Sequence, residues 1–410
     1  MSINKHLLDL MNAEAENRKM LHMTAYENQM SETARRFMSS TLSDRYFFGG
    51  GEDGVINWDP FTTLGIKAVE SIQHDAERAV KHMLSGSVVN LKCLSGVHAM
   101  MCAIFVATNP GDTVMIIHHD DGGHFSTQPI LERTGRKVVY ATFDANELAF
   151  DIEKTAKTYY ESGATALYLD ISYPLKPIDI KGIRHALGDR AVIIYDASHT
   201  VGLMMGGKFQ SPLTEGADIL CANTHKTLPG PHKGMIVFKD EKWGQPLNDV
   251  INNGLFSTSH THHLMALALT ILEMEQFGEA YADQIIRNTN ALGSALTEQG
   301  LSVREIEPGR FSETHQLHLF LPDGDISELY KKFIHNDISV NFDNRLGGRL
   351  FARIGTQELT RRGMKESDMK IIAKLIFDAL QGEDIRNRVE EYNARFKTIH
   401  YSFDEVSSRG

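Results

Sequence analysis

Cysteine is scarce in this sequence: only Cys93, Cys102 and Cys221 occur among the 410 residues, and no two of them form a Cys-x-x-Cys pair. An odd number of cysteines without that spacing argues against a disulfide framework and against a cysteine-rich zinc site. We therefore expect three buried, reduced thiols, as is usual for a cytoplasmic protein.

Long hydrophobic runs and an excess of positive charge are also missing. The longest apolar run, Ala99 to Ala107, is nine residues, whereas a membrane-spanning helix needs about 20. The N-terminal residues form a charged amphipathic pattern without the apolar segment of a signal peptide. The 42 Lys and Arg against 53 Asp and Glu give a net charge of −11, which disfavours nucleic acid as a partner. A cytoplasmic enzyme with no membrane or nucleic-acid partner is the expectation.

Short apolar runs alternate with helical patterns through the first two thirds of the chain. Most runs are continuously apolar, which is typical of strands buried on both faces, so an α/β fold with a mostly parallel sheet is predicted. The expected strands are Val88–Lys92, Thr113–Ile117, Lys137–Tyr140, Ala166–Ile171, Ala191–Tyr195, Asp218–Cys221 and Met235–Phe238. A helix is expected over 61–83, with Asp59 as its cap and Pro60 in its first turn.

The pattern divides the chain into three parts: an N-terminal helical arm (1–55), a large α/β domain (56–285) and a smaller α+β domain (286–410). Residues 262–299 read as one long helix or two. In the small domain we expect strands at Thr314–Leu321 and Arg349–Ile354, helices at 325–335 and 366–380, and a loosely packed charged tail after 384.

Three tempting motifs lack their structural context. Gly49, Gly51 and Gly54 fit G-x-G-x-x-G, but no strand precedes them and no helix follows directly. Residues 202–208 have the spacing of a phosphate-binding loop without the Ser or Thr that should follow. The histidines at 118–119 and 260–263 lack the spacing of a zinc site. No nucleotide site and no metal site are expected.

The stretch 191–239 contains the candidate catalytic residues. A buried strand ends in Asp196, followed by Ser198 and His199, and a second strand leads into Thr224-His225-Lys226-Thr227 and a Pro/Gly turn. An enclosed lysine can lose its proton and become a nucleophile. Lys226 and Asp196 fit pyridoxal 5'-phosphate (PLP): Lys226 would form a Schiff base, and Asp196 would keep the pyridine nitrogen protonated.

Further residues fit the same cofactor. Ser95 and Gly96 stand between a strand and a helix, where backbone N–H groups favour a phosphate. His124 follows the next strand and could stack on the cofactor ring, unless it is a capping or core histidine. Arg353 could bind an amino-acid carboxylate bidentately, or form an ordinary surface ion pair.

Motifs over nearly the whole chain resemble the serine hydroxymethyltransferase family of fold-type-I PLP enzymes: AYEN at 25–28, PGDTV at 110–114, GGHF at 122–125, DASH at 196–199, THKTLPGP at 224–231 and RIGTQELTRRGMKE at 353–366. The resemblance implies that Lys226 carries the cofactor, with Thr224 in the same motif, and that Asp196 meets the ring nitrogen and His199 the ring oxygen. It places His124 on the ring, Ser172 near the cofactor and Arg353 at the substrate carboxylate. It also implies a homodimer with shared active sites, in which Thr258 and Ser259 reach the neighbouring subunit's phosphate.

The sequence departs from that family at specific positions. Phe48 stands where the family has a glutamate that serves in acid–base catalysis and folate binding, although the nearby Tyr46 is retained. Tyr26 replaces a substrate-side serine, and His232-Lys233 replaces Arg-Gly. A closer likeness is to L-threonine transaldolases, which share the patterns of HDDGGHF, MGGKF, GADILCANTHKTLPGPHKG and MEQFGEAYADQI.

The expected reaction is cleavage of the Cα–Cβ bond of L-threonine and addition of the glycyl unit to a second aldehyde. Tyr46, His124 and Glu27 are candidates for the base, and Arg353, Tyr26 and Glu27 for substrate binding. The alternatives are a serine or α-methylserine hydroxymethyltransferase, or a paralogue that decarboxylates, eliminates or racemises an amino acid. A cofactor-binding regulator without activity is a third class, disfavoured by the intact Asp196, His199 and Lys226.

Overall fold

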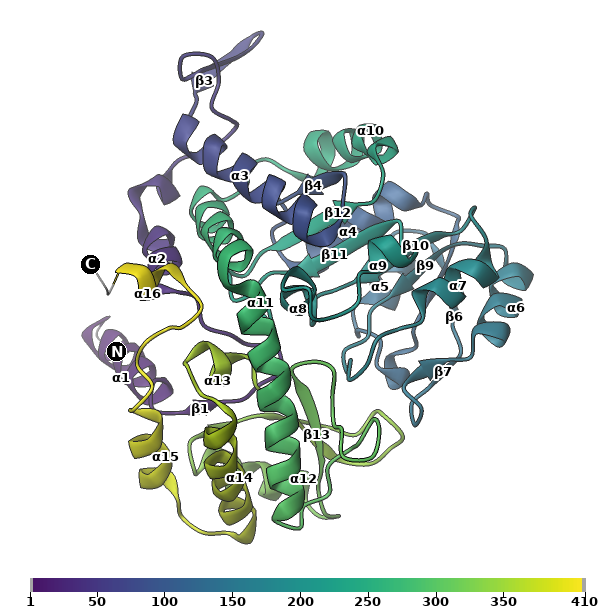
Figure 1. The fold of residues 1–410 in the computed structure, drawn as a ribbon. Helices are drawn as coiled ribbons and strands as arrows, with labels where there is room; N and C mark the ends of the chain where they lie inside the picture. Colours follow the sequence, from purple (N-terminus) through teal and green to yellow (C-terminus); the bar gives the residue numbers. More distant parts are fainter. Residues whose placement is uncertain (1–2, 408–410) are drawn as a thin grey trace.

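A computed structural model describes residues 3–407, without the side chains of residues 252, 253, 406 and 407. Its centre is a seven-stranded sheet in the order β4-β12-β11-β10-β9-β5-β6 (Figure 1). These strands are β4 (Val88–Asn90), β5 (Thr113–Ile116), β6 (Lys137–Tyr140), β9 (Ala164–Leu169), β10 (Val192–Asp196), β11 (Ile219–Asn223) and β12 (Gly234–Phe238). β12 runs antiparallel to both of its neighbours, and the pairs among β11, β10, β9, β5 and β6 are parallel. The predicted mostly parallel sheet is confirmed.

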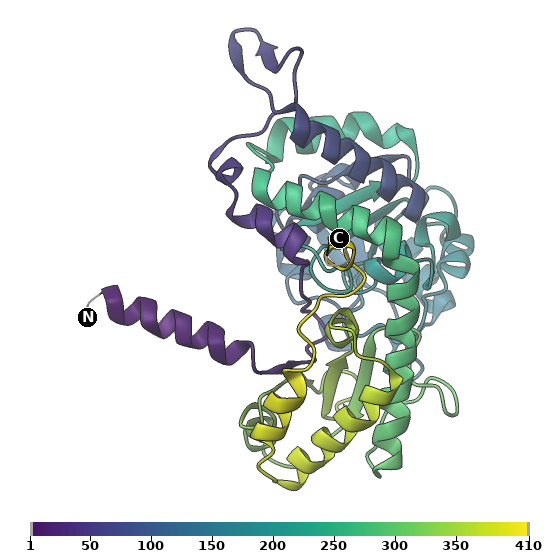
Figure 2. The ribbon, with the colours of Figure 1, turned by 60° about the vertical axis from the view of Figure 1, so that its left-hand side comes forward.

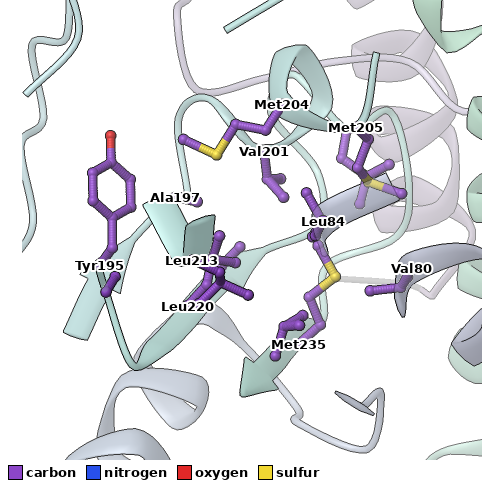
Figure 3. Close-up of a cluster of buried hydrophobic side chains, with 14 of the residues drawn as sticks. Val80, Leu84, Tyr195, Ala197, Val201, Met204, Met205, Leu213, Leu220 and Met235 are labelled. Carbon is purple, nitrogen blue, oxygen red and sulfur yellow. The ribbon is translucent and has the colours of Figure 1, made fainter. Parts of the chain in front are cut away.

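Helices cover both faces of this sheet, which is why its strands are continuously apolar. Along β9, Leu167 and Leu169 join one hydrophobic cluster, whereas Ala166 and Tyr168 join the other. Figure 3 shows part of the first cluster, with side chains from α3, α8, β11 and β12 gathered in one place. The helices of this region are α3 (Lys67–Leu84), α4 (Gly96–Ala107), α5 (Thr127–Arg133), α6 (Ile152–Ser162), α7 (Ile180–Leu187), α8 (Val201–Met205), α9 (Pro212–Glu215) and α10 (Gly244–Leu247), followed by a π-helix (Asn248–Leu255). Cys93, Cys102 and Cys221 are buried, as predicted.

The segment predicted as one helix over 61–83 is divided, and that prediction is wrong at its N-terminal end. β2 (Val55–Trp58) and β3 (Phe61–Leu64) form a hairpin around Asp59-Pro60, and α3 begins only at Lys67. Asp59 therefore caps no helix. β-branched and aromatic residues on both sides of a two-residue turn favour a hairpin over a helix. The hairpin projects from the body of the molecule (Figures 1 and 2).

A second hydrophobic core lies in the C-terminal part, around the antiparallel sheet β13-β16-β15. The single long helix α11 (Thr261–Glu298) packs against α3 and α8 of the first region and α13 and α14 of the second. The elements here are β13 (Gln316–Phe320), β14 (Ile338–Ser339), β15 (Asn341–Asp343), β16 (Phe351–Gly355), α12 (Ile326–Ile334), α13 (Gln357–Arg361), α14 (Glu366–Gln381), α15 (Arg386–Asn393) and α16 (Phe403–Ser407). The tail is not loosely packed, because Val389 and Tyr392 of α15 are buried in this core.

The N-terminal arm is only partly helical. It comprises α1 (Ile3–Asn17), β1 (Leu21–His22), α2 (Glu32–Arg35) and two short 3₁₀ turns (Arg36–Ser39 and Thr41–Asp44), and β1 pairs with β14. The prediction of a helical arm over 1–55 missed this strand. No residue of α1 is buried, and the helix extends away from the body (Figure 2). Within residues 3–407, no helix is both long and apolar enough to cross a membrane.

Candidate active site

A cavity of about 210 Å³ opens where several parallel strands end, the edge at which α/β folds bind ligands. It gathers most of the predicted cofactor residues from separate elements. Those that line it are Ser95, Gly96, His124, Ser172, Asp196, His199 and Lys226.

Lys226 follows β11 in a turn that the neighbouring threonines hold in shape. The Thr224 hydroxyl donates to the Pro231 carbonyl at 2.5 Å, and the Thr227 hydroxyl donates to the His199 carbonyl at 2.8 Å. Lys226 Nζ lies 3.0 Å from His199 Nε2. Burial lowers the pKa of Lys226 to about 7 against the opposing effect of Asp196, and Arg353 lowers it further. A neutral, nucleophilic amine is therefore accessible near neutral pH.

Asp196 ends β10, the strand next to β11, so its carboxylate meets the same cavity. The Tyr168 hydroxyl donates to Asp196 Oδ2 at 2.5 Å, and the Ser198 backbone N–H donates to Oδ1 at 2.8 Å. These two donors hold the carboxylate in one orientation. An anchored anion at this place fits the role of partner to a protonated pyridine nitrogen.

The N-terminus of α4 forms another wall of the cavity. Ser95 caps this helix by accepting the His98 N–H at 3.1 Å, and Gly96 opens it. A Cβ at Gly96 would lie 2.7 Å from Asn223 Cβ, so glycine is needed for the helix to approach β11 this closely. Backbone N–H groups at a helix N-terminus suit a phosphate. This wall, Lys226 and Asp196 together offer PLP a phosphate cradle, an amine and a carboxylate.

His124 lines the cavity from the loop before α5. Its backbone N–H donates to Asp170 Oδ2 at 3.1 Å, and its ring Nδ1 accepts the Ser126 N–H at 3.3 Å. Burial is the main reason that the pKa of His124 lies below its ordinary value. A neutral ring in this tautomer carries its proton on Nε2, so it can stack on a cofactor or donate a hydrogen bond at the cavity wall.

Arg353 on β16 approaches the cavity from the C-terminal core. Its Nε donates to Asn341 Oδ1 at 3.0 Å and its Nη1 to the Ser172 carbonyl at 3.0 Å. The guanidinium lies 5.3 Å from the Tyr26 ring and 5.2 Å from the Tyr173 ring. Arg353 is buried and forms no ion pair with a carboxylate among the described residues, so the alternative of a surface ion pair is wrong.

Other predicted residues lie outside this cavity. Tyr46 is 61% exposed and stacks on Phe48 at 5.7 Å. Glu27 is exposed, and Tyr26 touches the site only through Arg353. Thr224 uses its hydroxyl in the turn, while Thr258 and Ser259 precede α11 and do not line the cavity. Their predicted roles stay predictions.

The sequence reasoning missed several residues that build the site. Asp170 is buried at the end of β9 and accepts both the His124 N–H and the Thr127 hydroxyl, at 2.5 Å for the latter. An acid at the end of a buried strand was the signal used for Asp196, and it would have found Asp170 too. Asn28 Nδ2 donates to the Lys226 carbonyl at 2.5 Å, and Gln316 reaches His199. Asn28 belongs to the AYEN motif at 25–28, but no local pattern indicates its contact with Lys226 or that of Gln316 with His199, because these partners are distant in sequence.

The histidine-rich patches gather rings without forming a metal site. His225 stacks on His232 at 3.7 Å, and His262 lies 4.3 Å from His263. No group of three or more His, Cys, Asp or Glu residues in the described chain is arranged to hold a metal ion.

Comparison with known proteins places this chain in a family. The family model for serine hydroxymethyltransferase matches residues 1–376. The chain is 34% identical to a serine hydroxymethyltransferase of Methanosphaera stadtmanae over 94% of this chain and 92% of that one. It is 33% identical to a fluorothreonine transaldolase of Streptantibioticus cattleyicolor over 97% of this chain, which spans 63% of that protein's length.

Solved structures agree. The crystal structure of an L-threonine transaldolase from Pseudomonas fluorescens in its internal aldimine state superposes with a TM-score of 0.89. That chain is 28% identical, and the match covers 98% of this chain and 94% of that one. The chain therefore belongs to the serine hydroxymethyltransferase family and is a PLP-dependent transferase or aldolase of fold type I.

Proposed function

We propose that this enzyme is an L-threonine transaldolase, which releases acetaldehyde from threonine and joins the remaining glycyl unit to another aldehyde. The observation that carries the proposal lies at Phe48, the position where the resemblance expects the hydroxymethyltransferase glutamate. Phe48 packs against Tyr46, Trp58 and Phe61, with ring centroids 5.6–5.8 Å away. None of these rings lines the cavity of its own chain, so the cluster would meet an aldehyde only at the cavity of a partner subunit. There its apolar rings would suit an uncharged aldehyde better than the acid–base and folate-binding role of the glutamate.

The residues of the cavity would hold PLP in a defined orientation. The N-terminus of α4 at Ser95 and Gly96 would bind its phosphate, Asp196 its ring nitrogen, His124 its ring face and Lys226 its aldehyde carbon. The bound cofactor supplies an electron sink for the electron pair released at the substrate Cα.

Arg353 would anchor the threonine carboxylate. Its Nε and Nη1 donate to Asn341 and Ser172, which leaves Nη2 without a hydrogen bond among the described residues. The Tyr26 and Tyr173 rings flank the guanidinium and restrict its motion. A carboxylate anchored at this point would fix the orientation of the substrate and thereby which of its Cα bonds is cleaved.

Of the three candidate bases for the threonine β-hydroxyl, His124 is the one that lines the cavity of its own chain. Its lowered pKa keeps the ring neutral, but its free lone pair is on Nδ1, which accepts the Ser126 N–H, so His124 would take the hydroxyl proton only after turning its unprotonated nitrogen toward the substrate. Tyr46 and Glu27 are exposed outside this chain's cavity. Tyr46 would act only across a subunit boundary.

A homodimer with shared active sites forms part of the proposal. Tyr46, Thr258 and Ser259 lie outside the cavity of their own chain, and the resemblance places the last two at the neighbouring subunit's phosphate. Mixing Lys226→Ala and Tyr46→Phe protomers tests this arrangement. Hybrid dimers should recover part of the activity that each variant lacks, and no recovery would exclude a contribution of Tyr46 across the interface.

The decisive test uses the PLP-loaded enzyme and L-threonine without folate. We expect acetaldehyde release, a long-wavelength absorbance change, and a new β-hydroxy-α-amino acid when a second aldehyde is added, detected by mass spectrometry. Lys226→Ala serves as the inactive control. No response to threonine, together with turnover of serine that requires tetrahydrofolate, would replace the proposal with the second candidate.

That second candidate is a serine hydroxymethyltransferase. It is favoured by the match to the Methanosphaera stadtmanae enzyme, which covers 92% of that chain, against 63% for the fluorothreonine transaldolase.

A further inference from the structure

Gln316 is a buried glutamine of β13 that reaches from the C-terminal core to the histidine beside Lys226. It is 0% exposed, and its Nε2 lies 3.2 Å from the Ser172 carbonyl oxygen and 3.0 Å from His199 Nδ1. Burying an amide is costly unless its hydrogen bonds are made. Gln316 makes them at its NH₂ end, while its Oε1 has no partner among the described residues.

The Ser172 carbonyl fixes the orientation of this amide. A carbonyl oxygen only accepts, so the NH₂ end of Gln316 must face it. A third neighbour, His315 Nε2, lies 3.5 Å away but points its own proton at the Ala25 carbonyl at 3.0 Å. The second amide hydrogen therefore goes to His199 Nδ1, which must offer a lone pair.

The other ring nitrogen follows by elimination. A neutral imidazole with a lone pair on Nδ1 carries its proton on Nε2. His199 Nε2 lies 3.0 Å from Lys226 Nζ, so its N–H points at the amine. An ammonium group has no lone pair to accept that hydrogen bond, whereas a neutral amine has one.

We propose that Gln316 is a positioning residue that fixes His199 in its Nε2–H tautomer and thereby holds Lys226 as a neutral amine ready to capture a carbonyl carbon. The inference rests on the proposed function only in taking Lys226 as the lysine that binds the cofactor. With its amide turned so that Oδ1 faces the lysine, Asn223 accepts from Nζ at 3.3 Å. The amine then has one hydrogen bond accepted and one donated.

The surrounding charges are compatible with this arrangement. His199 faces Lys226, Arg353, His315 and His124, which all disfavour its protonated form, and burial is the largest cause of its lowered pKa. Lys226 faces Asp196, which favours the ammonium, and Arg353, which opposes it. A protonated His199 would also point an Nδ1–H at the Gln316 NH₂, a contact between two donors.

The test reads the tautomer directly in the apoenzyme, so it needs no turnover. In protein with ¹⁵N-labelled histidine, the His199 signal is assigned as the one lost in His199→Asn, and ring nitrogen shifts report which nitrogen carries hydrogen. We expect an unprotonated Nδ1 in the wild type. In Gln316→Glu a carboxylate accepts from the ring, so the proton should move to Nδ1. Gln316→Met removes the donor without adding charge and should give a mixture.

Lys226 gives a second readout, its rate of reductive methylation by formaldehyde in the apoenzyme, measured by mass spectrometry of the Lys226 peptide. At neutral pH we expect labelling to be about tenfold slower in Gln316→Glu, which corresponds to a rise of about one unit in the pKa of Lys226. The effect in Gln316→Met should be smaller. Gln284→Met is the matched control, because Gln284 is a buried glutamine of α11 that donates to Asn288 and Glu366. It should leave both readouts unchanged.

A proton on Nδ1 in the wild type would overturn the inference, as would unchanged tautomer and labelling in Gln316→Glu. If Gln316→Glu fails to fold, the tautomer of His199 in the wild type and in Gln316→Met still tests the inference. An enzyme that ignores threonine but shows the expected tautomer would refute the transaldolase proposal alone.

Discussion

Two buried clusters of charge in this molecule are built on opposite principles. Between α11 and α13, Glu273 and Arg361 are both fully buried and form an ion pair of 2.7 Å. Around Lys226, the Asp196 carboxylate is held by hydrogen bonds from Tyr168 and Ser198 and not by an ion pair, and polar atoms of Asp170, His225 and Gln316 have no partner among the described residues. The first cluster pairs its two charges, although Arg361 Nε has no hydrogen-bond partner among the described residues, whereas the second leaves several polar groups free to bind a ligand. Substitutions should therefore cost stability in the first and activity in the second.

The largest expected effect is the loss of activity in Lys226→Ala. Removing the amine that binds the cofactor should lower threonine turnover by at least about 10³-fold and abolish the visible absorbance of the loaded enzyme. The unfolding midpoint in urea should change little, because the pocket contributes little to stability. Near-normal turnover would contradict the site assignment, and a large loss of stability would contradict the comparison.

The second prediction concerns the buried ion pair of Glu273 and Arg361. Arg361→Met leaves Glu273 buried and unpaired, and breaking a buried pair costs about 3–5 kcal/mol of unfolding free energy, measured by urea denaturation. The double variant Glu273→Met/Arg361→Met should recover much of that loss. Arg78→Gln is the control, since Arg78 and Glu275 are partly exposed to solvent, and solvent screening should make the loss of this pair much less costly. Equal costs for the two single variants would remove the distinction between buried and exposed pairs.

A smaller effect is expected at Arg353. Arg353→Lys keeps the charge but loses the planar fork and its bonds to Asn341 and Ser172. We expect kcat/KM for threonine to fall by roughly 10–100-fold, mostly through KM, with PLP still bound, in steady-state kinetics. A loss confined to kcat would argue against a role in anchoring the carboxylate.

The smallest expected effect is a shift in pH dependence. The Lys226 pKa of about 7 means that the amine is protonated below this pH and neutral above it. The rate at which apoenzyme captures PLP should therefore rise with pH and level off above about 8. Asp196→Asn removes the charge that raises the lysine pKa, so its midpoint should move to lower pH. A midpoint near 10 in the wild type would contradict the burial argument.

Much of the fold could be predicted because its signals are local. Continuous apolar runs indicated all seven strands of the main sheet, and both faces of that sheet are indeed covered by helices. The hairpin at Val55–Leu64 was mistaken for helix because Ala-, Glu- and Lys-rich residues that follow it extend the helical pattern backwards. The pairing of β1 with β14 joins segments more than 300 residues apart, and no short window contains that information.

The candidate site likewise has a part that could be predicted from the sequence and a part that could not. The residue types and their places at strand ends determined that Lys226, Asp196, Ser95 and His124 would meet at one edge, because parallel strands present their carboxyl ends together. Only the tertiary structure decided what surrounds them: Asn28 on the Lys226 carbonyl, Tyr168 on Asp196 and Gln316 on His199. Hydrogen bonds between distant segments depend on side-chain positions that packing sets, so the sequence determined which chemistry is present and the fold determined in which protonation state it is held.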